Sequence, residues 1–164
     1  MEAYFDNSAT TIVTDSVKDI VVKTMTEDFG NPSAMHMVGV KAEKYIKEAQ
    51  ENIAKILKVD PKEIFFTSGG TESNNMAIIG TAMANKRKGN KIITTSVLAT
   101  MKYLEEQGFE VIYLPVDRYG VVQMEALEKE MTEDTILVST MYVNNEVGSV
   151  QPVAEAASIV KAYN

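Results

Sequence analysis

Two adjacent glycines between hydroxyl residues form the part of this sequence best suited to chemistry. Residues 68–71 (SGGT) follow an apolar stretch, 64–67, and precede a helical pattern. Glycine lets the backbone approach a ligand because no Cβ stands in the way. Free N–H groups and the positive dipole at a helix start favour an anion. Gly70 and Thr71 are therefore candidates for holding a phosphate group, with Ser68 and Thr71 as hydroxyl donors.

The same turn has a plainer interpretation. It is not a Walker A motif, because no Gly-Lys-Ser/Thr follows, and it is not G-x-G-x-x-G. Taken alone, the turn favours an ordinary strand–helix connection in which Thr71 caps the helix.

Other polar clusters are ambiguous when each is considered alone. Residues 144–146 (NNE) follow an expected strand, where an amide could bond a flat heteroaromatic ring, but Asn is also common in turns. Residues 7–11 (NSATT) and 30–33 (GNPS) look like turns. His36 could act as an acid, a stacking group or a helix-entry contact, and a structural or surface role is favoured.

Composition excludes several classes of site. Sixteen Lys and Arg against 23 Asp and Glu give a net charge of −7, which disfavours a nucleic-acid-binding face. Cysteine is absent and His36 is the single histidine. Disulfides, a thiol nucleophile, metal sites and a His-based charge relay within the chain are therefore not expected.

The sequence shows no sign of membrane insertion or secretion. No apolar run approaches the ~18 residues of a membrane helix. The N-terminus (MEAY) has no basic and apolar regions of a secretory signal. We expect a cytoplasmic protein.

Apolar and amphipathic segments alternate along the 164 residues. Strands are expected at 64–67, 91–95, 110–114 and 135–139, and helices at 15–29, 38–57, 72–86, 98–107, 124–130 and 153–163. This order predicts an α/β fold with a mainly parallel sheet of about four strands flanked by helices. Ligands on such sheets usually bind at the carboxyl ends of the strands.

Taken together, the motifs resemble one family. Five segments, in order along the chain, are similar to cysteine desulfurases of the NifS/IscS type: 5–11 (FDNSATT), 29–33 (FGNPS) with His36, 66–75 (FTSGGTESNN), 134–139 (DTILVS) and 143–148 (VNNEVG) leading to QP. No single motif is specific, but five in register are. The family belongs to the class V, fold-type I enzymes that use pyridoxal 5′-phosphate (PLP).

The resemblance implies an activity and a set of site residues. Family members remove sulfur from cysteine, which leaves alanine and an enzyme persulfide that feeds iron–sulfur cluster assembly. Gly70 and Thr71 would hold the PLP phosphate, and Asn145 would contact the ring hydroxyl. The residues expected near the substrate are Asn7, Ala9, Thr10, Asn31 and His36.

The chain also departs from the family pattern. Residues 1–164 would form an incomplete PLP-binding large domain, covering less than half of a family member. The family's Glu-His pair, whose histidine stacks on PLP, is missing after Ser96, by a deletion of about five residues. The family's Asp at the pyridine nitrogen, its Schiff-base Lys and its catalytic Cys lie beyond Asn164. No residue here is therefore assigned a catalytic or metal-binding role, and the chain alone is expected to be inactive.

The family's strand order raises the question of how this part of the fold is completed. Family members place strands from the second half of the chain between the first and fourth strands expected here. The 64–67 strand could close directly on 135–139, two copies could exchange elements, or a C-terminal chain could complement this one. We expect a homodimer or such a complementing chain, and iron–sulfur assembly proteins as further partners, with no nucleic acid or membrane.

A second function stays open. The chain could be a degenerate anion-, phosphate- or partner-binding module that kept the scaffold without catalysis. An independent α/β-hydrolase-like enzyme is set aside, because the sequence lacks a Gly-x-Ser-x-Gly elbow and a suitable histidine.

Overall fold

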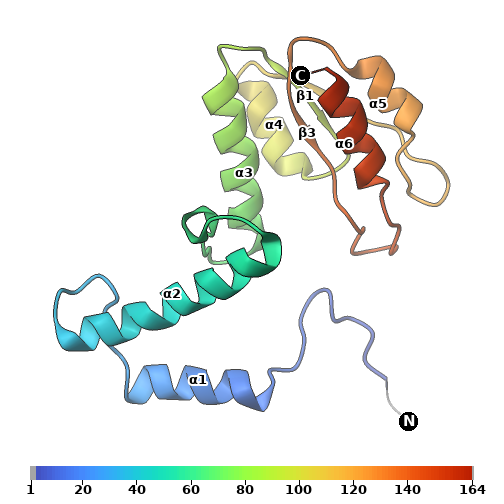
Figure 1. Cartoon of the computed structure of the whole chain (residues 1–164). Helices are drawn as coiled ribbons and strands as arrows, with labels where there is room; N and C mark the ends of the chain where they lie inside the picture. The colour runs from blue at the N-terminus through green and yellow to red at the C-terminus, as the bar shows by residue number, and fades with distance from the viewer. Residues whose placement is uncertain (1–2, 164) are drawn as a thin grey trace. The chain divides into compact units, whose positions relative to one another are not determined.

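The computed structural model describes residues 3–163, which form two compact units (Figure 1). Unit 1 runs to Phe66, and unit 2 begins at Thr67. Each unit is described by itself below.

A three-stranded parallel sheet forms the centre of unit 2. Strand β1 (Lys91–Thr94) pairs with both β2 (Glu110–Tyr113) and β3 (Thr135–Ser139), in the order β2-β1-β3. Ile92 and Ile93 on β1 are fully buried. Because successive strand residues point to opposite faces, these two isoleucines anchor two separate cores.

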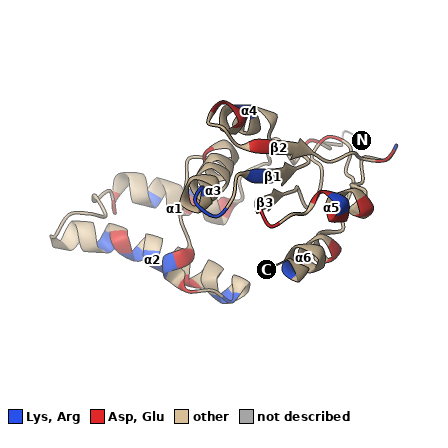
Figure 2. Cartoon of the chain, turned by 90° about the horizontal axis from the view of Figure 1, so that it is seen from above, with Lys and Arg blue, Asp and Glu red and all other residues tan. Residues whose placement is uncertain are grey.

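Helices cover both faces of this sheet. Ile92 packs in one core with residues of α3 (Gly70–Asn85) and α4 (Leu98–Glu106), and Ile93 in the other with residues of α5 (Met124–Glu130) and α6 (Val153–Ala162). Figure 2 shows α3 and α4 on one side of the strands and α5 and α6 on the other. The predicted α/β architecture with a parallel sheet between helices is confirmed, and most predicted element ends lie within three residues of the observed ones.

The prediction of a strand at 64–67 is wrong. Residues 64–67 form no strand, and Phe65 and Phe66 are 72% and 55% exposed. Within residues 3–163, β3 pairs only with β1, so 64–67 does not close directly on it. A strand needs a neighbour for its N–H and C=O groups, and a run of apolar residues does not supply one.

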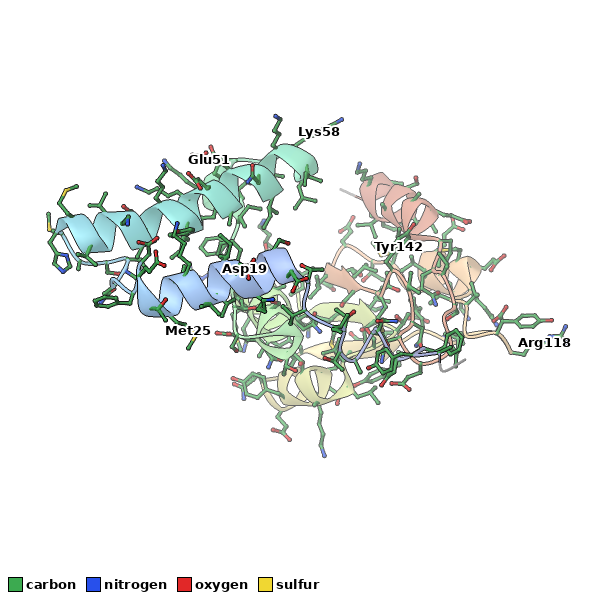
Figure 3. The ribbon with its side chains drawn as sticks, turned by 90° about the horizontal axis from the view of Figure 1, so that it is seen from below. Asp19, Met25, Glu51, Lys58, Arg118 and Tyr142 are labelled. Atoms are coloured by element: carbon green, nitrogen blue, oxygen red, sulfur yellow. The ribbon has the colours of Figure 1, made fainter. Side chains whose placement is uncertain are left out.

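Unit 1 consists of α1 (Asp15–Thr26), α2 (Met37–Leu57) and the short 3-10 helix η1 (Pro61–Glu63). Helix α1 buries none of its side chains within the unit. Its apolar residues Val17, Ile20 and Met25 are 53%, 49% and 73% exposed, and Figure 3 labels Met25. The amphipathic spacing thus predicted the helix, but it did not predict which residues would cover the apolar face.

A buried carboxylate holds the α1–α2 connection in unit 1. The Asp28 side chain is 1% exposed, and the Lys41 Nζ lies 2.6 Å from its Oδ1. The Tyr45 hydroxyl donates to Oδ2 at 2.6 Å, and the Lys23 Nζ lies 3.6 Å from the same oxygen. The hydrogen bonds from Lys41 and Tyr45 lower the pKa of Asp28 from 3.8 to about 2.

We predict that acid weakens unit 1 through Asp28. The folded-state pKa is depressed, so the stabilisation is present above pH ~4 and is lost as the pH falls toward ~2. Asp28→Asn should lower the melting temperature at pH 7 by several degrees and flatten its acid dependence. Circular dichroism melts measure this. The control is Asp15→Asn, because the Asp15 side chain is 91% exposed beside Lys18. An equal effect of both substitutions would contradict the prediction.

We also predict that unit 2 tolerates no side chain at Gly89. A Cβ there would lie 2.3 Å from the backbone oxygen of Asp134, which accepts the Lys91 N–H at the start of β1. Gly89→Ala should cost about 1–3 kcal/mol of unfolding free energy, since the clash is with backbone. Denaturant unfolding measures it.

The matched control is Gly80→Ala in α3, where a Cβ meets no atom within 4 Å. There alanine should stabilise by up to about 1 kcal/mol. A neutral Gly89→Ala would refute the close approach.

Candidate cofactor-phosphate site

The first turn of α3 keeps its backbone donors unused. The N-cap residue is Gly69, which has no side chain to cap with, and the first helical bond runs from the Ser73 N–H to the Gly69 oxygen. Within the described part of the chain, the N–H groups of Gly70, Thr71 and Glu72 donate no hydrogen bond. Thr71 is therefore not the helix cap, and that part of the plainer interpretation is wrong. Unpaired N–H groups at a helix start are suited to an anion.

Side chains around the turn hold its shape. The Glu72 carboxylate accepts from the Ser68 N–H at 2.6 Å and from the Ser68 hydroxyl at 2.7 Å. These bonds lower the pKa of Glu72, since they favour its charged form. The Thr67 and Ser73 hydroxyls lie 2.6 Å apart. Ser68 thus serves Glu72 inside the turn, and Thr71 is the hydroxyl left for a ligand.

Open space adjoins the turn. A Cβ built on Gly70 meets no atom within 4 Å. Thr71 lines a hollow of about 420 Å³ between α3 and α4, together with Asn74, Val97 and Tyr103. A phosphate group carried by a larger molecule therefore meets no steric block here.

The connection from β1 to α4 borders this hollow and is short. Residues 95–97 span it, and Val97 adopts φ 61° and ψ 46°, a left-handed conformation unfavourable for a β-branched residue. The Ser96 N–H donates to the Thr94 hydroxyl at 3.2 Å, which tightens the turn. No histidine stands in these residues.

A second polar loop follows β3. The Asn144 side-chain oxygen accepts from the N–H groups of Glu146 and Val147 at 2.9 and 3.0 Å. Asn144 is thus the turn-forming asparagine. Asn145 is exposed, and its amide donates to the Glu146 carboxylate at 2.8 Å. The two neighbouring asparagines therefore have different tasks, and the Asn145 amide oxygen accepts no bond from the described residues.

The phosphate turn and Asn145 share one edge of the sheet. Helix α3 ends at Asn85, shortly before β1 begins at Lys91, so its C-terminus lies at the amino edge. A helix of 16 residues is about 24 Å long, so its N-terminus reaches the carboxyl edge. Asn145 follows the C-terminal end of β3, at that same edge. The topology of unit 2 thus brings both segments to this edge, and the contacts of Gly70, Thr71 and Asn145 with a cofactor stay predictions.

The other predicted site residues belong to unit 1. Asn7, Ala9 and Thr10 are exposed in a turn, where the Ala9 and Thr10 N–H groups donate to the Asp6 oxygen and the Thr11 hydroxyl donates to Asn7. Their proximity to a substrate stays a prediction.

Asn31 and His36 shape the entry to α2. The Asn31 side-chain oxygen accepts from the Ser33 N–H at 2.9 Å. His36 is the N-cap of α2, and its Nδ1 accepts from the Gly39 N–H at 3.3 Å. A Cβ on Gly39 would lie 2.2 Å from the Ala34 oxygen, so the loop and helix fit closely. The helix-entry role for His36 is confirmed.

Metal-binding clusters and membrane-spanning helices are both absent from the described residues. Across 3–163, no group of three or more His, Asp or Glu side chains could hold a metal ion. No helix in that range is long and apolar enough to cross a bilayer.

A parallel α/β unit with free N–H groups at a helix start on its carboxyl edge is typical of domains that can bind an anionic ligand there. The chain belongs to the class V aminotransferase family, whose model matches residues 3–164. This confirms the family that the five sequence motifs indicated.

Known relatives narrow the comparison. The chain is 46% identical over 162 residues to "Cysteine desulfurase IscS 1" of Archaeoglobus fulgidus, covering 96% of this chain and 42% of that protein. It is 48% identical over 163 residues to "Cysteine desulfurase IscS" of Methanosarcina thermophila, covering 96% and 40%. The chain therefore spans less than half the length of these relatives.

Solved structures agree on the fold. A protein described as "NIFS-LIKE PROTEIN" superposes with a TM-score of 0.94 at 47% identity, covering all of this chain and 46% of that one. "SspA in complex with cysteine" superposes with a TM-score of 0.90 at 37% identity, covering 98% and 48%. The structural neighbours thus confirm that this is part of a NifS-like fold.

We predict that phosphate binds at the α3 turn through Thr71. Inorganic phosphate should raise the melting temperature of the chain. At a phosphate concentration 100 times the dissociation constant, binding should add about 2.7 kcal/mol to the free energy of unfolding. Thr71→Ala should remove most of this gain, because it deletes the free hydroxyl. Thermal melts with and without phosphate measure it. Thr81→Ala, farther along α3, is the control, and equal protection of both variants would contradict the site.

Proposed function

We propose that this chain is the N-terminal part of a PLP-dependent cysteine desulfurase and that it holds the phosphate and ring hydroxyl of the cofactor. One observation carries the proposal. Three unused N–H groups and the Thr71 hydroxyl open on free space at the sheet edge that also bears Asn145. The family membership supplies the cofactor for which this arrangement is suited.

Each residue has a distinct task in this proposal. The N–H groups of Gly70 and Thr71 and the Thr71 hydroxyl bind the phosphate dianion, and the α3 dipole adds to the attraction. Gly70 has no side chain, which leaves the approach open. Asn145 hydrogen-bonds the ring hydroxyl and fixes the rotation of the ring. When bound, PLP supplies the electron sink of the reaction.

Sulfur transfer needs groups that these residues do not contain. The reaction moves a sulfur atom through an enzyme thiolate, and the 164 residues include no cysteine. The tight β1–α4 connection also carries no histidine to stack on a ring. We therefore propose that residues 1–164 bind and orient the cofactor and that the remainder of the fold supplies the nucleophile, the covalent lysine and the acid.

The sheet supports completion by further strands. The outer side of β3 pairs with no other strand among the described residues, and half-buried β3 edges an apolar groove beside α6. Open edges of this kind pair readily with another strand. A parallel strand reached through α6 would lie beside β3. Such a strand would come from a longer chain, a complementing C-terminal chain or a second copy. In the completed enzyme, iron–sulfur assembly proteins would accept the sulfur.

We predict that thermal protection of the chain by cofactor analogues depends on their phosphate group. Pyridoxal 5′-phosphate and 4′-deoxypyridoxine 5′-phosphate should both protect the chain in thermal melts, whereas pyridoxal should not, because it lacks the phosphate. Asn145→Ala should lower the affinity for pyridoxal 5′-phosphate about tenfold, because one hydrogen bond to the ring is lost. Asn52→Ala, on the exposed surface of α2, is the control.

Two results would redirect the proposal. Protection by inorganic phosphate but not by any pyridoxal compound would favour the degenerate anion-binding module. Catalytic release of sulfide from cysteine by this chain alone would contradict the assignment of the nucleophile to the rest of the fold.

A further inference from the structure

Gln151 is a buried polar residue to which the sequence motifs assign no role. It is 7% exposed. Its Oε1 accepts from the Val122 N–H at 2.9 Å, and its Nε2 donates to the Gly120 oxygen at 2.8 Å and to the Ser149 hydroxyl at 3.3 Å. The side chain thus uses both ends of its amide.

These bonds join two loops that follow the two outer strands of the sheet, β2 and β3. The first loop, 116–122, comes after β2 and is closed by a bridge between Val116 and Val122. The second, 142–151, comes after β3 and is closed by a bridge between Val143 and Val150. Figure 3 labels Arg118 on the first loop and Tyr142 at the base of the second.

Gln151 sits at the base of the second loop. Its own N–H donates to the Tyr142 oxygen at 2.8 Å, which closes the loop, while its side chain reaches the first loop. The Ser149 hydroxyl also donates to the Gly120 oxygen, at 3.1 Å. The base of the second loop is therefore fixed to the first loop.

The tip of the second loop depends on this base. The Asn144 N–H donates to the Ser149 oxygen at 2.9 Å, two residues before Gln151, and the Gly148 N–H donates to the Asn144 oxygen at 2.9 Å. The Asn144 side chain then holds the Glu146 and Val147 N–H groups. Gln151, Ser149 and Asn144 form a continuous hydrogen-bonded series, and Asn145 follows Asn144 directly in the chain.

We propose that Gln151 is a positioning residue that aims Asn145 at the carboxyl edge of the sheet. This rests on the proposed function, in which Asn145 contacts the ring hydroxyl of PLP. Without the Gln151 amide, the buried Val122 N–H loses its partner and the Gly120 oxygen keeps only its bond from the Ser149 hydroxyl. The cost of these lost bonds drives both loops to rearrange. Asn145 then loses its fixed place without being changed itself.

The test compares Gln151→Met, which keeps the length and removes both polar ends, with Gln151→Glu, which keeps the acceptor for Val122. Gln107→Met is the matched control, since Gln107 is exposed at the end of α4. Amide hydrogen exchange of the free chain, followed by NMR, should accelerate about tenfold or more at Glu146 and Val147 in Gln151→Met. Neither of these amides bonds Gln151 directly. Gln151→Glu should fall between Gln151→Met and the unaltered chain.

A second readout separates positioning from general loosening. Gln151→Met should lower the affinity for pyridoxal 5′-phosphate about tenfold. It should change the affinity for inorganic phosphate less than about twofold, because the α3 turn is left intact. Equal weakening of both ligands, or none, would overturn the positioning role.

The proposed function and this inference fail in different ways. If the unaltered chain binds phosphate but not pyridoxal phosphate, the proposed function fails. Exchange then decides the inference alone, and unchanged exchange at Glu146 and Val147 in Gln151→Met overturns it.

Discussion

The burial of Ile92 and Ile93 on opposite faces of β1 is the constraint on which unit 2 depends. Both side chains are fully buried, one against α3 and α4 and the other against α5 and α6. Two cores on one central strand force helices onto both faces of the sheet. They also set the direction of α3, whose C-terminus must meet the amino end of β1. The first turn of α3 is thereby carried to the carboxyl edge, where ligands of such sheets bind.

The ability to bind a ligand at that edge comes from hydrogen-bond donors and acceptors that have no partner among the described residues. Most polar groups around the site already have partners: Ser68 is bonded to Glu72, and Asn144 to the backbone of its own loop. The exceptions are the N–H groups at the start of α3, the Thr71 hydroxyl and the Asn145 amide oxygen, within the part of the chain described. A buried unpaired group would be costly, but these groups face open space and are ready for a ligand.

Local signals in the sequence predicted most elements of unit 2, because the strands are rich in apolar residues and the helices are amphipathic. Gly108, with φ +88°, ends the region of α4 as expected of a glycine after a helix. The 64–67 segment was the failure. It has the apolar composition of a strand, but strand formation depends on a neighbour that no local pattern reveals. The sequence gives Gln151 no role for a similar reason, since its partners Gly120 and Val122 lie about 30 residues away in the chain.

Composition and motif order by themselves determined the family, the lack of any thiol and the presence of a single histidine, because these depend on residue identity alone. Tertiary structure decided which polar groups remain free. It made Gly69 rather than Thr71 the N-cap of α3. It also placed Asn144 inside the turn and left Asn145 exposed. Whether a donor is free depends on what lies around it, and in a folded chain those neighbours come from distant parts of the sequence.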